Sequence, residues 1–495
     1  MSIATTSEPE AAPAQILTRP LILAAGCVAL ADWLFYGWWD LGISLPLFLG
    51  VLGTAGVASN GAHTAGRRTG IIMIAVFAAG LLALVEQVNW LSAIWAGVAT
   101  AMFVVVMTAP DRAPWEQRLY EVLILPVLGP FQFATDVIWQ AWQWLRRDHG
   151  WLRLDYLIGW VVPLGIFAVF LSLFVSANPL IERGVLQIDW QAALNLLNPL
   201  RLAFWILLAG AIWPFVFRRN RRHWNPESKR GDNISAVNSG LDYLVGTAAT
   251  LRSLVLFNAL FALQTAMDLT YLWGGAALPD GLTYATYAHR GAYPLIATAL
   301  LAAAFVLVAM RRGGPAEQSR LIRPLVLIFT AQNVLLVISS IFRLDLYVAI
   351  YSLTYLRLAA FIWMGLVAAG LLLILAKIML LKSTYWLITA NAITLAIVLY
   401  GCCFLNAPWL IAHYNVEHSK EVSGTGQNLD LRYVESLGPQ AYAALERHAA
   451  KLPTFSVSFA RSENWRGWSF RTWRLDRYFA KPLTERLTSP VGGQG

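Results

Sequence analysis

Charged residues are scarce in this chain. Of its 495 residues only 13% are charged, whereas 58% are hydrophobic. A soluble protein of this size carries roughly 25% charged residues, so the composition excludes an ordinary water-soluble globular protein. Cysteine is rarer still, because Cys27, Cys402 and Cys403 are the whole set and each lies in an apolar stretch. This usage excludes a disulfide framework and a cysteine-based metal site, and we expect neither a metal nor a cofactor.

Sequence motifs for common chemistries are also missing. The chain has no Walker loop, no Gly-x-Ser-x-Gly motif and no dinucleotide-binding fingerprint, so ATP-driven transport by this chain alone is not indicated. His413 and His418 flank Glu417, but their spacing of five differs from the four-residue spacing of a helical zinc pair. Asp32 follows the first apolar stretch, as an acid does in some membrane glycosyltransferases, but the bulky external loops of those enzymes are missing.

Long apolar stretches are abundant instead. Each is about long enough to cross a hydrocarbon core of ~30 Å, and only helices satisfy their own backbone in lipid over such short runs. The sequence therefore predicts an all-α, polytopic membrane helix bundle with about eleven spans. These spans are expected at 20–37, 41–59, 70–85, 90–108, 156–176, 201–217, 252–273, 292–310, 322–342, 358–376 and 386–405.

The basic residues between these stretches lie almost entirely in every second loop, and the chain as a whole has a net charge of +9. Cytoplasmic loops of membrane proteins are enriched in Lys and Arg, so we expect a cytoplasmic N-terminus and, with an odd span count, a periplasmic or extracellular C-terminus. The loop 218–233 is the most basic. It is interpreted as a solvated determinant of orientation or, alternatively, as a segment attracted to anionic lipids. The clusters are Arg67–Arg68, Arg112–Arg153, Arg218–Arg230, Arg311–Arg323 and Lys377–Lys382.

Composition divides the chain into five parts, namely a disordered cytoplasmic tail 1–19, a four-helix unit 20–108, interfacial helices 109–155, a seven-helix unit 156–405 and a small extracytoplasmic domain 406–495.

The 109–155 part differs from the spans around it. Its piece 119–131 is short and interrupted by Pro126, Gly129 and Pro130, and its piece 135–147 is rich in tryptophan. We expect two separate helices at the cytoplasmic interface, where Trp rings favour the headgroup level. A re-entrant hairpin is the alternative.

Polar residues inside spans are the best indication of a site, because a charged group at mid-bilayer costs at least about 2.5 kcal/mol. In the seventh span Asn258, Gln264 and Asp268 lie on or beside one helix face. Arg290 follows in the next loop, just before span eight. In the ninth span Gln332 and Asn333 begin a second polar stripe.

That second stripe ends in a group of charged and aromatic residues. Arg343, Tyr347, Tyr351 and Tyr355 recur every four residues, which predicts one stripe of a helix. Asp345 and Arg357 lie nearby. The predicted outward cavity between spans seven and ten is lined by Asp268, Arg290, Arg343, Asp345, Tyr347, Tyr351, Tyr355 and Arg357, with Asn258, Gln264, Gln332 and Asn333 as its polar stripe.

Three functions are compatible with this pattern. The first is binding or transport of a small polar or anionic solute entering from outside. The second is a membrane scaffold or sensor component whose C-terminal part contacts an envelope protein, while the polar stripes only hold helices together and Asp268 pairs with Arg290 or Arg343. The third is a membrane-embedded enzyme acting on a lipid-linked substrate, although no catalytic residue is indicated.

The C-terminal part contains RSENWRGWSFRTWRLDRYF at 461–479, where arginines alternate with aromatic residues. Such mixtures occur on surfaces that stack nucleic-acid bases, but the predicted external position argues against nucleic acid. Membrane lipids, a polar ligand and an envelope protein are the expected partners.

Several ordered blocks resemble a known family. YAHRGAYPLIATALL, AQNVLLVISSIFRLDLYVAIYSLTYLR and LDLRYVESLGPQA are similar to a family of bacterial multi-pass membrane proteins classed as a domain of unknown function, of the 4173 or 4153 type. The resemblance covers roughly residues 200–480. It implies a bacterial cytoplasmic (inner) membrane protein and supplies no activity, so no catalytic residue is carried over.

Overall fold

The computed structural model describes residues 18–109 apart from 39 and 62–65, then 115–146, 198–218, 247–274, 320–455 and 464–482, with isolated positions in 163–170, 298–306 and 485–486. Every regular element among these residues is a helix, as the composition predicts. The chain divides into two compact units, residues 1–222 with 462–470 and residues 223–461 with 471–495. This division into two units does not test the five parts expected from composition, and their bounds stay predictions.

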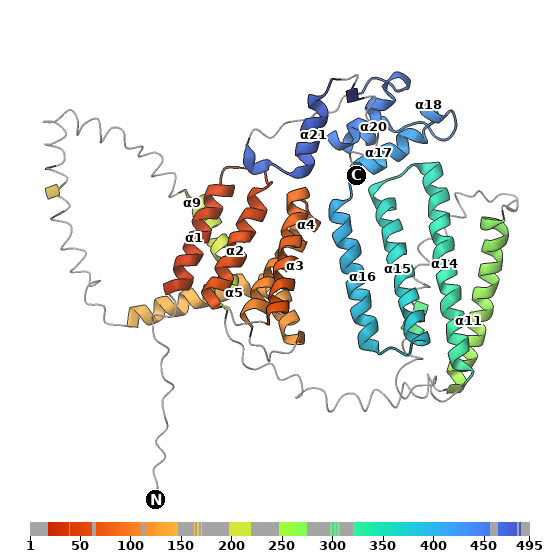
Figure 1. The fold of residues 1–495 in the computed structure, drawn as a ribbon, viewed down its shortest axis with the longest axis horizontal. Helices are drawn as coiled ribbons and strands as arrows, with labels where there is room; N and C mark the ends of the chain where they lie inside the picture. Colours follow the sequence, from red (N-terminus) through yellow and green to blue (C-terminus); the bar gives the residue numbers. More distant parts are fainter. Residues whose placement is uncertain are drawn as a thin grey trace, which may run out of the picture. The chain divides into compact units, whose positions relative to one another are not determined.

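The first unit contains six described helices around one apolar core (Figure 1). Asn89 begins one of them with a capping box, because its side chain accepts from the Ser92 N–H at 2.9 Å while Ser92 Oγ accepts from the Asn89 N–H at 3.0 Å. The helices are α1 (Thr18–Phe35), α2 (Ser44–Asn60), α3 (Arg67–Glu86), α4 (Trp90–Thr108), α5 (Trp115–Arg146) and α9 (Pro199–Val216).

Helices α3 and α4 approach closely because of glycine. A Cβ atom placed on Gly80 would lie 2.4 Å from the Cβ atom of Ala99. Phe77 and Phe103 stack with ring centroids 4.5 Å apart. Small residues that let backbones approach are the usual means of packing helices in lipid, where apolar burial drives association weakly.

The 115–146 segment is one continuous helix, so the prediction of two separate pieces is wrong, as is the alternative of a hairpin. Gly129, interpreted above as part of a break, has a packing role instead. A Cβ atom on Gly129 would lie 2.4 Å from Cγ of Pro214 in α9, so its absence allows α5 and α9 to pack closely. A helix tolerates the loss of single hydrogen bonds at proline when tertiary packing compensates.

The segment 464–468 packs on the loop between α1 and α2. Trp468 O accepts a hydrogen bond of 2.7 Å from the Ile43 N–H. A Cβ atom on Gly42 would lie 2.3 Å from the carbonyl carbon of Gly467, so any side chain there would collide with backbone. The Arg466 guanidinium lies 4.8 Å from the ring centroid of Trp33 and 4.9 Å from that of Trp38, which are cation–π distances.

The described residues of the second unit form four long helical stretches around their own core. Side-chain caps begin α15 at Thr354 and α16 at Ser383. Helices α11 and α14 run parallel, because Asn258 contacts Leu325 whereas the later Asp268 contacts the later Arg343. The stretches are α11 (Thr247–Met267) continued by the π-helical η3 (Asp268–Trp273), α14 (Ile322–Tyr351), α15 (Tyr355–Met379) and α16 (Thr384–Phe404).

Short helices follow α16 and pack on the ends of the long ones. Asn415 exchanges two hydrogen bonds with the backbone of Leu353, at 2.6 and 2.9 Å. The buried Arg471 donates to the carbonyls of Phe404 and Leu405 at 2.9 and 3.2 Å, which satisfies acceptors left open at the C-terminus of α16. These short helices are α17 (Ala407–Glu417), α18 (Lys420–Ser423), α19 (Leu431–Ser436), η4 (Pro439–Ala441), α20 (Tyr442–Arg447), η5 (Ala449–Lys451) and α21 (Phe470–Ala480). The short η6 (Trp465–Gly467) belongs to the first unit.

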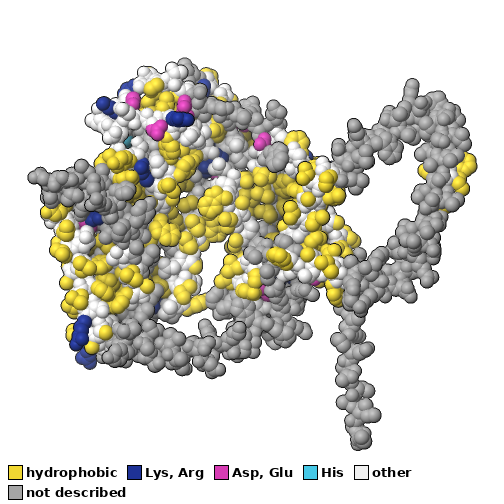
Figure 2. All heavy atoms as spheres, turned by 180° about the vertical axis from the view of Figure 1, so that it is seen from behind, with side chains coloured by type: hydrophobic (Ala, Val, Ile, Leu, Met, Phe, Trp, Pro, Cys, Tyr) yellow, Lys and Arg dark blue, Asp and Glu magenta, His cyan; other side chains and the backbone are white. Residues whose placement is uncertain are grey.

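Seven of the described helices are long and apolar enough to cross a membrane, and the shorter Ser44–Asn60 is also apolar. On the face drawn in Figure 2, hydrophobic side chains cover the helices and most charged side chains lie beyond their ends. The predicted spans 156–176 and 292–310 lie largely outside the described residues, so the count of eleven stays a prediction, as do the topology and a separate C-terminal domain. The seven are Arg67–Glu86, Trp90–Thr108, Pro199–Val216, Thr247–Tyr271, Ile322–Tyr351, Tyr355–Met379 and Thr384–Phe404.

Replacing Gly80 by Ala should destabilise the protein by about 1–3 kcal/mol, because α3 and α4 must separate to admit the methyl group. A Cβ atom on Gly97 in α4 would meet open space, with no atom within 4 Å. Gly97→Ala is therefore the matched control and should be neutral or stabilising by up to about 1 kcal/mol. Thermal unfolding of purified protein in detergent measures both. Equal melting temperatures for the two variants would contradict the close packing.

Candidate functional site

An ion pair lies inside the second unit, where α11 continues into η3 beside α14. Asp268 and Arg343 are 1% and 4% exposed and form a salt bridge. Gln264 Nε2 adds a hydrogen bond of 3.0 Å to Asp268 Oδ1. A charge at such a position in an apolar helix requires a partner, and Arg343 supplies it. Arg290, the other partner expected for Asp268, lies outside the described residues.

Other polar residues continue along the contact between α11 and α14. Asn258 Nδ2 donates to the carbonyls of Leu254 and Leu325, at 2.8 and 3.2 Å. Gln332 Nε2 donates to Asn258 O at 3.4 Å. We call Asn258, Gln264, Asp268, Gln332 and Arg343 the α11–α14 seam. The sequence pattern points to each of its members, and the structure brings them to one helix–helix contact.

Six described members of the predicted site are not part of this seam, namely Asn333, Asp345, Tyr347, Tyr351, Tyr355 and Arg357. Asn333 is buried, but its amide donates to Phe329 O of its own helix, at 2.7 Å. Asp345 is exposed. Tyr355 does not continue the stripe of Arg343, Tyr347 and Tyr351, because α14 ends at Tyr351 and α15 begins at Tyr355. The predicted single stripe is therefore wrong at its last member.

The reversal between α14 and α15 explains that difference. Ser352 has φ +66° and ψ 165°, which lies outside the α-helical region and ends α14, and Thr354 caps the next helix through the Arg357 N–H. Arg357 Nη1 donates to the carbonyls of Tyr351 and Ser352. Its guanidinium carbon lies 4.8 Å from the ring centroid of Tyr347 and 5.9 Å from that of Tyr351. Arg357 thus satisfies carbonyls left open where α14 ends.

The first unit contains a second, partly buried ion pair between α1 and α9. Arg201 donates through Nε to Asp32 Oδ1 at 2.9 Å and through Nη2 to Oδ2, a bidentate pair. Trp205 Nε1 donates to Asp32 Oδ1 at 2.8 Å. The Arg201 guanidinium also lies 4.8 Å from the ring centroid of Tyr36. Sequence reasoning points to Asp32 but misses its partner, although an arginine at the start of a distant apolar stretch is an available signal.

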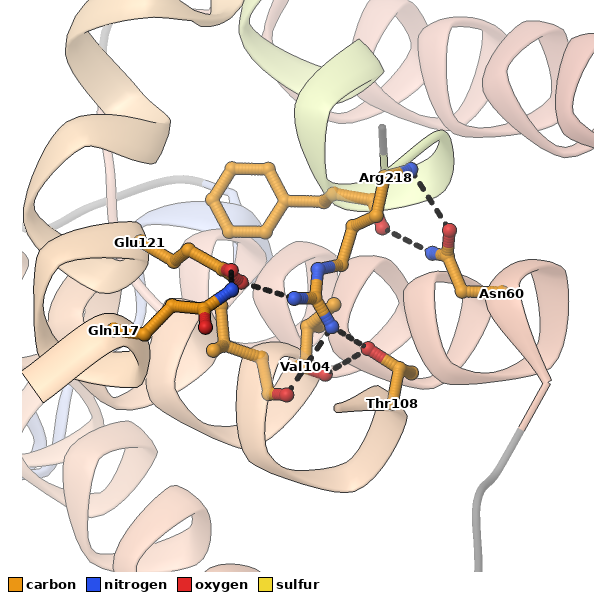
Figure 3. A network of polar contacts seen from close by, with 8 residues as sticks. Asn60, Val104, Thr108, Gln117, Glu121 and Arg218 are labelled. Atoms are coloured by element: carbon orange, nitrogen blue, oxygen red, sulfur yellow. Dashed lines mark hydrogen bonds and ion pairs between the residues drawn. The ribbon is translucent and has the colours of Figure 1, made fainter. Parts of the chain in front are cut away.

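Arg218 lies just after α9 and contacts residues of α2, α4 and α5 (Figure 3). Its Nη2 pairs with Glu121 of α5, while Nη1 donates to Thr108 Oγ1 and, at 3.2 Å, to Val105 O in α4. Its backbone N–H donates at 2.8 Å to Asn60 of α2, whose amide donates at 2.9 Å to Phe215 O of α9. The expectation that 218–233 is a solvated loop is thus wrong for Arg218. The remaining residues of that loop lie outside the described ones.

The C-terminal short helices contain a third group of charged residues. Glu446 is 4% exposed, accepts from Tyr478 Oη at 2.6 Å and pairs with Arg486 at 2.8 Å. Burial and the Glu446 carboxylate raise the pKa of Tyr478. His413 lies 3.4 Å from Glu417, and within the described residues no group of three or more potential ligands could hold a metal ion.

The apolar helices and the charges paired between them define the class of this protein, a polytopic membrane protein. Residues 48–448 match the domain of unknown function DUF4153, so the chain belongs to this family, as the resemblance of its sequence blocks indicated. No curated protein and no solved structure matches the chain.

Replacing only one member of the Asp268–Arg343 pair should strongly destabilise the protein. Asp268→Asn or Arg343→Gln leaves one buried charge unpaired, which costs about 3–5 kcal/mol. The double variant removes both charges and should be less destabilised than either single one. Thermal unfolding in detergent measures the effect. Asp345→Asn changes an exposed acid outside these contacts and should unfold like the wild type, and single variants as stable as Asp345→Asn would contradict the pairing.

Arg218 should also contribute more to the stability of the protein than an exposed basic residue at a helix end does. Arg218→Gln leaves Glu121 and two acceptors in α4 without their donor, and we expect a loss of about 1–3 kcal/mol. Arg68 is exposed, so Arg68→Gln serves as the control with the same charge change. Melting temperatures in detergent compare the two, and an equal shift would mean that the Arg218 contacts add no stability.

Proposed function

We propose that this membrane protein binds or transports a small polar or anionic solute, with the Asp268–Arg343 pair as the charged centre of its site. The proposal rests on one observation, a buried carboxylate and guanidinium at the contact of two apolar helices. Replacing a buried ion pair with apolar residues is often neutral or stabilising, so stability alone explains such a pair poorly. Intramembrane charges usually belong to substrate pathways or proton relays.

Two further features support this reading. Asp268 is the first residue of the π-helical segment Asp268–Trp273, and π-helical turns within α-helices occur frequently at functional sites. The amides of Asn258, Gln264 and Gln332 line the same seam. Together they give the pair a polar path along the helix contact, with Tyr347 one turn beyond Arg343. A solute of complementary charge would compete for one member of the pair.

We further propose that the site opens toward the outer face of the membrane. Alternation of basic loops supports a cytoplasmic N-terminus and an external C-terminus in a bacterial inner membrane. Asp268, just after the end of α11, and Arg343, in the C-terminal third of α14, would then lie toward the outer face. A ligand would enter from that side, with Arg290 as an additional cation.

A scaffold or sensor function is the second candidate, and a specific observation favours it. Arg201, Arg218 and Arg343 each pair with an acid from another helix, which is the pattern expected when charges fix helix positions. The C-terminal part would then contact an envelope partner. An enzyme on a lipid-linked substrate has weaker support, because Asp345 is exposed and does not join Asp268 in an acidic pair.

Complementation separates these functions. A strain lacking the protein is profiled across solutes and envelope stresses, then supplied with the wild type or with the double variant Asp268→Asn/Arg343→Gln. If the pair forms a solute site, the double variant should reach near wild-type abundance in the membrane and fail to restore growth. Replacing both partners is preferable to Arg343→Gln alone, because the single change leaves a buried unpaired acid.

The control is Asp345→Asn, which removes an exposed acid of the same helix and should restore growth. Full restoration by the double variant would refute the solute site. Loss of the double variant from the membrane, with normal abundance of Asp345→Asn, would instead support the scaffold function.

A further inference from the structure

Arg357 differs from three other arginines of the long helices and their ends, each of which pairs with an acid. Arg201, Arg218 and Arg343 pair with Asp32, Glu121 and Asp268. No described carboxylate pairs with Arg357, whose hydrogen bonds go to the two carbonyls of Tyr351 and Ser352. The cation is therefore held in place without being neutralised.

The contacts of Arg357 use only part of its guanidinium. Both carbonyls accept from Nη1, and the ring of Tyr347 covers one face at 4.8 Å. A guanidinium carries five N–H groups, so the edge formed by Nε–H and Nη2–H remains, and this edge has the spacing that matches two oxygens of a phosphate. No described residue accepts from that edge, and the side chain is only partly buried. The carbonyl contacts and the Tyr347 ring thus fix the orientation of the guanidinium, and its Nε–Nη2 edge is left for a ligand.

The surroundings of Arg357 have the composition of a membrane interface. The neighbouring Tyr351 and Tyr355 are 51% and 47% exposed, and Leu356 is 83% exposed. These residues lie where two apolar helices, Ile322–Tyr351 and Tyr355–Met379, end and begin. Tyrosine is enriched at the headgroup level, where one side of the ring contacts hydrocarbon and the hydroxyl contacts water. An exposed leucine beside them favours an acyl chain as a further contact.

We propose that the Nε–Nη2 edge of Arg357 binds the phosphate of a lipid headgroup. The site is independent of the Asp268–Arg343 pair and of the function proposed for it. A lipid is favoured over free phosphate because a single exposed cation binds a water-soluble anion weakly, whereas a lipid is already concentrated in the bilayer and adds chain contacts at Leu356. Tyr351 and Tyr355 lie beside the headgroup in this arrangement.

The test compares lipids with the same acyl chains. The full-length protein in detergent is incubated with phosphatidylglycerol or with a diglucosyl diacylglycerol that lacks phosphate, and bound lipid is counted by native mass spectrometry. The wild type should retain phosphatidylglycerol about tenfold more strongly than Arg357→Gln does, since one charge-assisted hydrogen-bonded pair is removed. The glycolipid should bind both proteins equally. Arg432, an exposed residue of α19, supplies the matched control Arg432→Gln, which should bind as the wild type does.

If Arg357→Gln fails to fold, Arg357→Lys is used instead. This variant keeps the positive charge and removes the paired N–H groups of the Nε–Nη2 edge. It should retain phosphatidylglycerol several-fold more weakly than the wild type, because an ammonium group binds phosphate as a point charge. Equal retention of the two lipids by the wild type would overturn the proposal, as would equal retention of phosphatidylglycerol by Arg357→Gln and the wild type. Displacement of phosphatidylglycerol by millimolar inorganic phosphate would assign the site to a soluble anion instead.

Discussion

A charge placed among apolar helices must find its counter-charge within the protein, and the Asp268–Arg343 contact is the clearest instance of this constraint here. Hydrocarbon cannot solvate a carboxylate or a guanidinium. The pair therefore fixes the rotation of α11 against α14, because either side chain would be left unpaired if one helix turned. The amides of Asn258 and Gln332 extend this restriction along the parallel helices. The register of the second unit follows from a few polar atoms more than from its many leucines.

The same constraint applies to backbone carbonyls at helix ends, and arginine meets it repeatedly. Arg218 reaches Val105 O, Arg357 reaches the carbonyls of Tyr351 and Ser352, and Arg471 reaches those of Phe404 and Leu405. Each guanidinium offers several donors in one plane, so one side chain can satisfy two acceptors. The positive charge also lies at the negative end of a helix. Besides the orienting role expected of basic loops, arginines in this chain donate hydrogen bonds to the carbonyls left open at helix C-termini.

The sequence predicts helices well and contacts poorly. Apolar length alone locates α3, α4, α9, α15 and α16 to within a few residues, because lipid leaves a segment of that length few other structures. It locates the start of α14 but not its end, which lies nine residues beyond the predicted span at Tyr351. The polar seam is also foreseeable, since Asn258 and Asp268 share a helix face. What fails depends on tertiary packing. Gly129 beside two prolines suggests an interrupted helix, but it packs against Pro214 within a continuous one. No local sequence pattern distinguishes a glycine that interrupts a helix from one that allows close packing. The stripe through Tyr355 fails because Ser352 adopts a positive φ angle, which serine rarely does.

The contact of Gly42 and Ile43 with Gly467 and Trp468 has a consequence for biosynthesis. The ribosome makes the α1–α2 loop long before Trp468, so the loop remains without this backbone partner while the later long helices are made and inserted. Trp33 and Trp38 lack the Arg466 cation throughout that interval. The α1–α2 hairpin of this protein therefore reaches its final packing only after Gly467 and Trp468 have been made, and its local structure depends on a segment that lies beyond all of the long helices.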